Sequence, residues 1–278
     1  MAEIKEILQK NNFRFNKALG QNFITDSNLL RAIVKDSGVT KDDTVVEIGA
    51  GAGTLTAALC ENAKKVFAFE VDGNLKPILN ETLAGVENCE VVFKDVLRMK
   101  DEELAAKVGE NFKVVANLPY YITTPLMMRF IESDLNVSTL TLMMQKEVAE
   151  RLVAKENTPE YGAVTVAVQA VADVSVTRII DRRLFYPVPN VDSALVHIVS
   201  NPNKYNFANF ETFKKVAKSV FLMRRKTLAN NLISAFSLPR ETCEKILKNM
   251  NLSPLVRGEA LSVEQLVELS GEINEILG

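Results

Sequence analysis

The stretch Asn117-Leu118-Pro119-Tyr120-Tyr121 contains groups that could prepare an amino group on a planar base for reaction. The Asn117 side-chain carbonyl and the Pro119 backbone carbonyl can both accept hydrogen bonds from such an amino group. Tyr120 and Tyr121 offer flat apolar faces, and stacking of a base on an aromatic side chain contributes roughly 1–3 kcal/mol. Two acceptors beside a stacking face predict a site for chemistry on an exocyclic amine.

A glycine-rich turn, Glu47-Ile48-Gly49-Ala50-Gly51-Ala52-Gly53, lies between an expected strand and an expected helix. Glycines at such a turn allow positive φ and a close approach of the backbone to a ligand. A dinucleotide-binding fingerprint needs Gly-x-Gly-x-x-Gly, but Thr54 occupies its sixth position. Alternate glycines preceded by an acid instead resemble the first motif of methyltransferases that use S-adenosylmethionine, and a tight turn without a ligand is the competing interpretation.

Two carboxylates follow the next two expected strands. Glu70 ends the first of them, where a carboxylate can accept hydrogen bonds from both ribose hydroxyls of a nucleoside. Asp95 ends the second and could accept from the exocyclic amine of an adenine, although an Asp at this position is usually a cap. Because ligands of open α/β sheets bind beyond the carboxyl ends of the strands, Glu70, Asp95 and Asn117 predict one pocket.

Short apolar runs alternate with helical stretches from Thr44 onward, which is typical of βαβ units with a mostly parallel sheet. Strands are expected over 44–48, 66–70, 90–94, 113–117, 137–144, 173–180 and 194–200. Helices are expected over 1–12, 26–36, 53–62, 73–83, 101–107, 124–133 and 145–155. The apolar segment 162–172 could be helix or strand, and a helix is preferred. After about residue 206 only helices are expected, over 209–222, 226–236, 239–249 and 262–276.

These elements predict an α/β fold with two domains. Residues 1–203 are expected to form a Rossmann-like, S-adenosylmethionine-dependent catalytic methyltransferase domain with a mostly parallel sheet. Residues 204–278 are expected to form a small all-helical C-terminal domain that contacts RNA, and Arg224-Arg225-Lys226 is its expected phosphate contact. A solvated surface is the competing interpretation of this and every other basic cluster.

Composition limits the classes that remain open. The chain has 278 residues, of which 47% are hydrophobic and 24% charged, as in ordinary globular proteins. The formal net charge of −2 argues against a protein that coats nucleic acid through a large positive field. No run approaches the roughly 18 apolar residues of a membrane span, and the start is charged, so a cytoplasmic location is expected.

Cysteine and histidine usage does not indicate a metal. Cys60, Cys89 and Cys243 are far apart, and His197 is the only histidine. This spacing supports neither zinc nor disulfides, so no metal is expected and His197 is interpreted as structural.

Across nearly its whole length the chain resembles the ribosomal RNA adenine dimethyltransferase family, specifically the small-subunit enzymes whose loss gives kasugamycin resistance. The matching segments are Gln21-Asn22-Phe23, Glu47-x-Gly49-x-Gly51-x-Gly53, Glu70, Asp95, Asn117-Leu118-Pro119-Tyr120, Tyr161-Gly162 and Phe185-Tyr186-Pro187-x-Pro189-x-Val191-Asp192-Ser193. The chain departs from many relatives at Tyr121, where they carry Asn, and at Ala50, where they carry Pro.

The resemblance implies roles for individual residues. The residues implied in binding S-adenosylmethionine are Asn22, Ile24, Gly49, Glu70, Asp95 and Asn117. The residues expected in catalysis are Asn117, Pro119, Tyr120 and Phe185, where Tyr120 stacks on the base and Phe185 closes on its opposite face. An aromatic side chain packed in the core is the competing interpretation of Phe185.

The implied reaction is dimethylation of N6 of two adjacent adenosines in the 3′-terminal hairpin loop of 16S small-subunit ribosomal RNA. The implied partner is that RNA within a pre-assembled small subunit, with no DNA and no membrane, and the protein is expected to be a monomer. The alternatives are a large-subunit ribosomal RNA methyltransferase that confers antibiotic resistance, a DNA adenine methyltransferase, and a non-enzymatic ribosome assembly factor.

Overall fold

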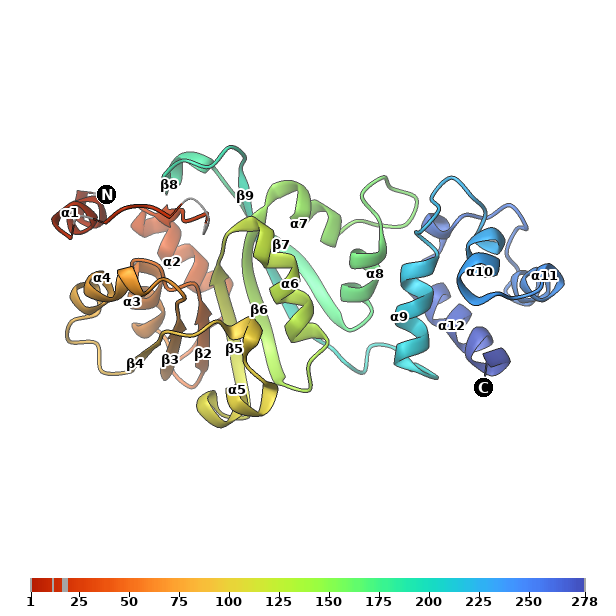
Figure 1. Cartoon of the computed structure of the whole chain (residues 1–278), viewed down its shortest axis with the longest axis horizontal. Helices are drawn as coiled ribbons and strands as arrows, with labels where there is room; N and C mark the ends of the chain where they lie inside the picture. The colour runs from red at the N-terminus through yellow and green to blue at the C-terminus, as the bar shows by residue number, and fades with distance from the viewer. Residues whose placement is uncertain (1, 12, 17–19, 278) are drawn as a thin grey trace. The chain divides into compact units, whose positions relative to one another are not determined.

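The computed structural model describes residues 2–11, 13–16 and 20–277, which divide into two compact units (Figure 1). The first unit comprises Met1–Ala149 and Ser175–Ser200, and the second comprises Glu150–Val174 and Asn201–Gly278. The chain therefore enters the second unit, returns to the first, and ends in the second. This division differs from the expected boundary at residue 203, because residues 150–174 belong to the second unit.

Within the described residues, seven strands form the sheet of the first unit, in the order β4-β3-β2-β5-β6-β9-β7 (Figure 1). The strands are β2 (Thr44–Ile48), β3 (Lys65–Phe69), β4 (Cys89–Val92), β5 (Asn111–Asn117), β6 (Asn136–Gln145), β7 (Ala172–Ile180) and β9 (Ser193–Ser200). Neighbouring strands from β4 to β6 are parallel, and β9 is antiparallel to β6. The mostly parallel sheet expected from the sequence is confirmed, and its order reverses between β2 and β5, where open α/β sheets bind ligands.

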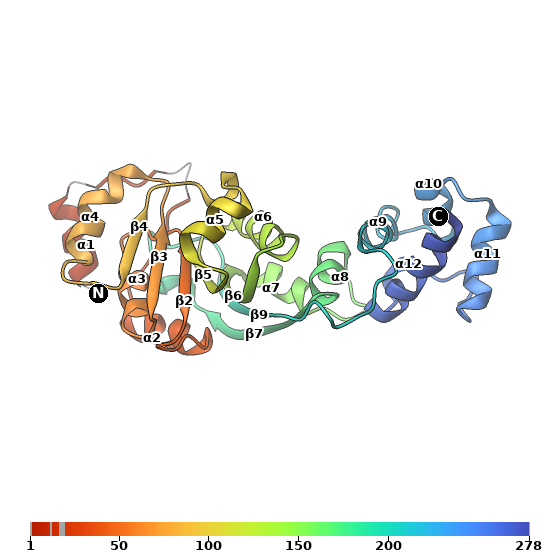
Figure 2. The ribbon, with the colours of Figure 1, turned by 90° about the horizontal axis from the view of Figure 1, so that it is seen from below.

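The helices of this region are α1 (Ala2–Lys10), α2 (Ser27–Asp36), α3 (Thr54–Cys60), α4 (Lys76–Thr82), α5 (Asp101–Val108), α6 (Tyr120–Ile131) and α7 (Lys146–Leu152). The Asp26 carboxylate accepts from the backbone N–H of Leu29 at 2.8 Å and caps α2. Leucines and isoleucines of α2 and α3 pack in one buried cluster with Val45 and Val66 of the sheet. In Figure 2, α5 and α6 lie on the opposite side of the strands from α2, so both faces of the sheet are covered.

Helix α6 starts earlier than expected. The sequence predicts a helix over 124–133, but Pro119 stands at the N-cap and Pro125 lies inside the helix. Tyr120 and Tyr121 therefore occupy the first turn of α6, immediately beyond the end of β5.

A second, two-stranded sheet was not expected from the sequence. Strand β1 (Phe23–Ile24) pairs antiparallel with β8 (Phe185–Tyr186), in the register Phe23 to Tyr186 and Ile24 to Phe185. Two-residue strands carry no detectable period in a sequence. The pairing brings the N-terminal motif beside the proline-rich segment, although about 160 residues separate them in the chain.

The second unit is helical. It contains α8 (Ala163–Gln169), α9 (Phe210–Ser219), α10 (Leu228–Phe236), α11 (Arg240–Asn249) and α12 (Val263–Leu277). Tyr161 is buried in its core, and the Tyr161 hydroxyl donates to the Leu261 carbonyl at 3.0 Å. This packing explains why residues 150–174 join the second unit. In the described part of the chain, no helix combines the length and apolarity needed to cross a membrane.

Candidate active site

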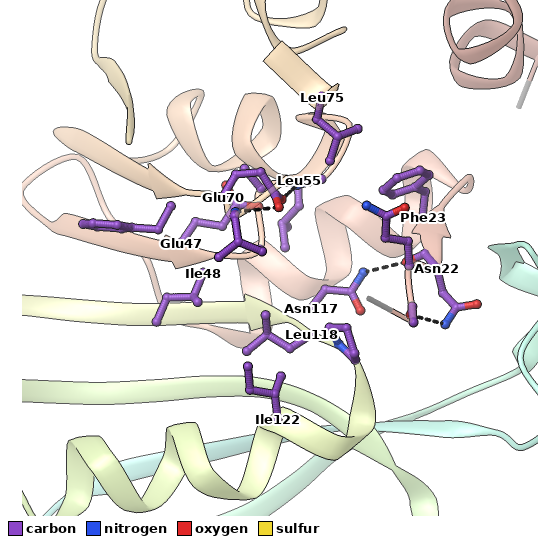
Figure 3. A pocket seen from close by; sticks show the side chains of 18 of the residues that line it. Asn22, Phe23, Glu47, Ile48, Leu55, Glu70, Leu75, Asn117, Leu118 and Ile122 are labelled. Atoms are coloured by element: carbon purple, nitrogen blue, oxygen red, sulfur yellow. Dashed lines mark hydrogen bonds between the residues drawn. The ribbon is translucent and has the colours of Figure 1, made fainter. Parts of the chain in front are cut away.

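A pocket in the first unit opens beyond the carboxyl ends of β2, β3 and β5 (Figure 3). Its lining includes every residue that the sequence assigns to the cofactor or to catalysis: Asn22, Ile24, Gly49, Glu70, Asp95, Asn117, Pro119, Tyr120 and Phe185. They come from four strand ends, the N-terminal segment and β8. The structure therefore brings all of these residues together around one pocket.

The turn after β2 requires glycine for two separate reasons. Gly49, Gly51 and Gly53 have φ of +81°, +56° and +82°, in the left-handed region that favours glycine. A Cβ atom on Gly49 would lie 2.7 Å from Leu118 Cδ2, and one on Gly51 would lie 2.9 Å from Phe23 Cε1. The backbone of this turn thus lines the pocket, and Leu118 and Phe23 pack where side chains at positions 49 and 51 would lie.

The Glu70 carboxylate fixes the same turn. Its Oε2 accepts from the backbone N–H of Gly51 at 2.8 Å, and its Oε1 accepts from the N–H groups of Val71 and Asp72, each at 2.8 Å. An ionised carboxylate offers about four lone-pair positions, so three protein bonds leave room for one more. Glu70 can therefore accept a hydrogen bond from a ligand while it holds the turn.

Glu47 also lines the pocket, although the sequence assigns it no role in cofactor binding or catalysis. It faces the pocket from β2 with 1% of its surface exposed, and among the described residues its Oε2 has no hydrogen-bond partner. Burial raises the pKa of the Glu47 carboxyl well above its ordinary value, and the nearby Cys89 and Glu70 raise it further. The acid of the glycine motif was the available signal for Glu47.

Asp95 serves as a cap and also lines the pocket. Its Oδ1 accepts from the backbone N–H of Leu97 at 3.0 Å and caps a short 3₁₀ turn over Val96–Arg98. Its Oδ2 lies 3.2 Å from the Arg98 guanidinium, whose side chain is exposed. The capping interpretation is therefore correct, and it does not remove Asp95 from the pocket wall.

Asn117 is oriented by the N-terminal segment. Its Nδ2 donates to the backbone carbonyl of Asn22 at 3.3 Å, and the Asn22 side chain in turn donates to the Gly20 carbonyl at 3.0 Å (Figure 3). The donor side of the Asn117 amide is thus engaged, which directs its side-chain oxygen toward other partners.

Gln21 is a second residue whose role the sequence did not reveal. Its Nε2 donates to the Asp72 carboxylate at 2.7 Å, and its Oε1 accepts from the backbone N–H of Asn16 at 3.0 Å. Asp72 is buried two residues beyond Glu70. Gln21 therefore ties the segment that carries Asn22 to the end of β3.

At the start of α6, Pro119, Tyr120 and Tyr121 differ in their hydrogen bonds and exposure. The Pro119 carbonyl accepts from the N–H of Ile122 at 3.1 Å and from the Thr123 hydroxyl at 3.3 Å. The Tyr120 hydroxyl lies 2.9 Å from Ser193 Oγ, whereas Tyr121 is 64% exposed. The Tyr120 hydroxyl is thus anchored on a buried group.

Phe185 packs in the core and also lies on the pocket wall. Only 4% of its surface is exposed, and it packs in the cluster between α2, α3 and the sheet. It also lines the pocket, opposite Ile24 in the short β1–β8 ladder.

Other candidates lie outside the pocket. The Arg224 Nη2 donates to the carbonyls of Pro159 and Tyr161, and Arg224, Arg225 and Lys226 are all exposed. His197 Nδ1 lies 3.0 Å from the Thr141 hydroxyl, and burial lowers its pKa. Among the described residues, no three His, Cys, Asp or Glu side chains are grouped to hold a metal.

Comparison with known proteins assigns the family. A family model described as ribosomal RNA adenine dimethylase matches residues 12–273. The chain belongs to this family. Ribosomal RNA small subunit methyltransferase A of Clostridioides difficile (strain 630) is 44% identical over 273 residues, covering 97% of this chain and 94% of that protein. The protein of the same name from Streptococcus thermophilus (strain ATCC BAA-491 / LMD-9) is 43% identical and covers 98% and 96%.

Solved structures agree with this assignment to the dimethylase family. A dimethyladenosine transferase from Plasmodium falciparum superimposes with a TM-score of 0.78 at 24% identity, over 91% of this chain and 98% of that one, which shows a shared fold. The 23S rRNA methyltransferase ErmE gives a TM-score of 0.71 at 27% identity, over 91% and 99%. The expected methyltransferase fold and enzyme class are confirmed. The higher identity to the small-subunit enzymes does not favour the large-subunit alternative.

Proposed function

We propose that this dimethylase transfers methyl groups from S-adenosylmethionine to N6 of two adjacent adenosines in the 3′-terminal hairpin loop of 16S ribosomal RNA, during small-subunit biogenesis. The name of the relatives at 42–44% identity supports the small subunit as substrate. The observation that carries the chemistry is the placement of Asn117, whose amide is oriented by Asn22 at the edge of a pocket lined by carboxylates.

The pocket fits S-adenosylmethionine, a cofactor with a cationic sulfonium, an α-amine and a nucleoside. Glu47, buried and with one oxygen unpaired among the described residues, would ionise when a positive group of the cofactor lies nearby, and Glu70 would accept from a ribose hydroxyl. Asp95 can accept from an adenine amine, and Gly49 places backbone without a side chain on the pocket wall. Asn22 and Ile24 would cover the cofactor from the N-terminal segment.

The cofactor supplies a methyl group on a positively charged sulfur, so the protein has to supply alignment and charge stabilisation rather than a strong base. The Asn117 oxygen would accept one hydrogen of the target amine, because its Nδ2 is already engaged. The Pro119 carbonyl would accept the other hydrogen in place of the 3.3 Å bond from Thr123. Both acceptors make the amine nitrogen a better nucleophile.

The base itself would lie between two aromatic side chains. Tyr120 is the proposed stacking partner because its hydroxyl is anchored, and Phe185 is the proposed wall on the opposite face. An unpaired loop adenine suits this arrangement, since it can be extruded into a pocket at little cost in stacking.

The proposed working form is a cytoplasmic monomer that acts on a pre-assembled small subunit. With a net charge of −2, the protein cannot rely on a large positive field to bind RNA phosphates. This supports a substrate that also offers protein or folded RNA surfaces. In the second unit, the exposed Arg224, Arg225 and Lys226 are the proposed phosphate contacts, and the Arg224 Nη2 also donates to backbone carbonyls.

The test is a methylation assay with radiolabelled cofactor on three substrates: small subunits that lack the modification, protein-free 16S RNA, and protein-free 23S RNA. We expect incorporation into the small subunits, with dimethylated adenosines mapped to the 3′-terminal hairpin loop. Product on 23S RNA and none on small subunits would overturn the assignment in favour of the large-subunit enzyme. Equal rates on naked 16S RNA would remove the assembled particle from the proposal.

A further inference from the structure

Ser193 makes a contact that none of the roles above explains. It is the first residue of β9, its side chain is fully buried, and its Oγ lies 2.9 Å from the Tyr120 hydroxyl. In the chain, 73 residues separate the two. The proline-rich segment Phe185–Ser193 therefore ends on a hydroxyl group that contacts the first residue of α6.

The backbone on both sides of Ser193 is held firmly. Ser193 pairs with Gln145 at the end of the β6–β9 ladder. The carbonyl of Asp192 accepts from the N–H of Lys146 at 3.1 Å, and the Asp192 carboxylate accepts from the N–H of Arg182 at 3.1 Å. The Ser193 hydroxyl is consequently a fixed point and not a mobile side chain.

The orientation of the Tyr120 ring depends on a fixed hydrogen-bond partner. A tyrosine ring on the first turn of a helix can take several staggered orientations about χ1, and a partly exposed ring is not confined to one of them by packing. The neighbouring Tyr121 has 64% of its surface exposed. A hydrogen bond from the ring's far end to a buried hydroxyl selects one orientation of Tyr120.

We infer that Ser193 is a positioning residue: its hydroxyl holds the Tyr120 ring in the orientation in which the target adenine stacks. This inference rests on the proposed role of Tyr120 in base binding. Ser193 does not contact the base, and it acts on the reaction only through the Tyr120 hydroxyl.

The kinetic test compares Ser193→Ala, Tyr120→Phe and the double variant on unmodified small subunits. Each single variant removes one partner of the same bond and keeps the aromatic ring, so each should lower kcat by about three- to tenfold, as expected for one hydrogen bond. KM should change little, because the rest of the particle interface is intact. The double variant should be no slower than the slower single variant, whereas multiplied losses would overturn the inference.

Thr141→Val is the matched control for general damage to the sheet. Thr141 is also fully buried, and its hydroxyl bonds His197 directly across the same β6–β9 ladder, remote from the pocket lining. This variant should lose thermal stability to a similar extent and keep the wild-type kcat. If it slows methylation as much as Ser193→Ala does, Ser193 acts through stability alone and the inference falls.

A second measurement does not depend on the substrate. The chain has five tyrosines, so ring signals from ¹³C-labelled tyrosine can be resolved by NMR and Tyr120 assigned from the Tyr120→Phe variant. In Ser193→Ala, the Tyr120 ring signals should shift and lose their single fixed environment, while the other four stay in place. Unchanged Tyr120 signals would overturn the inference even if methylation fell. If the wild type methylated no small subunits, the proposed function would fail, and this measurement would still decide whether Ser193 holds Tyr120.

Discussion

The two sides of the pocket are built differently. On the cofactor side, the Glu70 carboxylate and the glycine turn are linked by hydrogen bonds between residues at most 19 positions apart. On the side where the base is proposed to bind, Asn117 depends on Asn22 and Tyr120 depends on Ser193, across 95 and 73 positions. The first side is a local construction of strand ends, and the second is assembled from distant segments.

This difference matters for function. A locally built cofactor side can keep its shape when the distant segments move, whereas the base side loses its geometry when any one of them shifts. Gln21 connects the two sides, because it ties the segment of Asn22 to Asp72 at the end of β3. Variants on each side should therefore separate cofactor binding from catalysis.

The largest effect is expected from Asn117→Ala. Loss of an acceptor that acts on the developing charge should lower kcat by about 10²–10³-fold, the range seen when one such polar group is removed from an active site. Affinity for S-adenosylhomocysteine, measured by calorimetry, should change much less. Asn111→Ala, at the exposed opposite end of the same strand, is the control and should behave as wild type. An equal loss of cofactor affinity in Asn117→Ala would contradict the separation of the two sides.

Glu70→Gln should give the opposite pattern. The amide keeps one acceptor oxygen but loses charge-assisted bonds, which contribute about 1.5–3 kcal/mol each, so cofactor affinity should fall about ten- to hundredfold. At saturating cofactor, kcat should recover most of its wild-type value. Glu81→Gln removes an exposed carboxylate that bonds Lys10, and it provides the control. A defect in kcat that saturation does not relieve would show that Glu70 also serves the base side.

Gly51→Ala tests whether the cofactor side depends on local backbone geometry. An alanine at position 51 would keep the backbone φ of +56°, and its Cβ atom would lie 2.9 Å from the Phe23 ring. The free energy of unfolding should therefore fall by about 1–3 kcal/mol. Urea unfolding measures the loss. Gly73→Ala is the matched control, since no atom lies within 4 Å of its added Cβ and its φ is not positive. Equal stability of the two variants would contradict the strained-turn account.

The same difference explains what could be predicted from the sequence. The glycine motif, Glu70 and Asp95 are short-range signals, and the strand Thr44–Ile48 was placed at its observed limits. The β1–β8 pairing, the Gln21–Asp72 bond and the Tyr120–Ser193 contact join segments with no periodic signal between them, so one sequence could not reveal them.

The second unit illustrates the same limit. Its helices were expected close to their observed bounds, because amphipathic periods are local. The attachment of residues 150–174 to it depends on Tyr161, whose hydroxyl reaches Leu261 a hundred residues later. Arg224 was expected to contact phosphate because basic clusters are visible in a sequence, but its backbone partners are not.

The smallest effect, and the one with a distinctive pH dependence, is expected from Glu47→Gln. Burial raises the pKa of the folded-state carboxyl well above its ordinary value of 4.5. Below pH 4.5 both the folded and the unfolded chain carry the proton, so the variant and the wild type should melt at similar temperatures. As the pH rises above 4.5, the unfolded chain ionises Glu47 freely while the folded chain keeps the proton or buries a charge, and the stability of the wild type falls. Glutamine does not titrate, so without cofactor the variant should melt about 2–4 °C higher than the wild type at pH 8, the shift that about 1 kcal/mol produces in a chain of this size.

Cofactor should reverse that order. A cationic ligand stabilises the ionised Glu47 and cannot do so for glutamine, so saturating S-adenosylmethionine should raise the melting temperature of the wild type more than that of the variant. Glu90→Gln, whose carboxylate is half-exposed and bonds Lys107, should show neither effect. If Glu47→Gln were more stable at pH 8 and yet gained as much from the cofactor, Glu47 would be a buried acid of the turn with no part in holding the positive charge, and the cofactor side would rest on Glu70 and Asp95 alone.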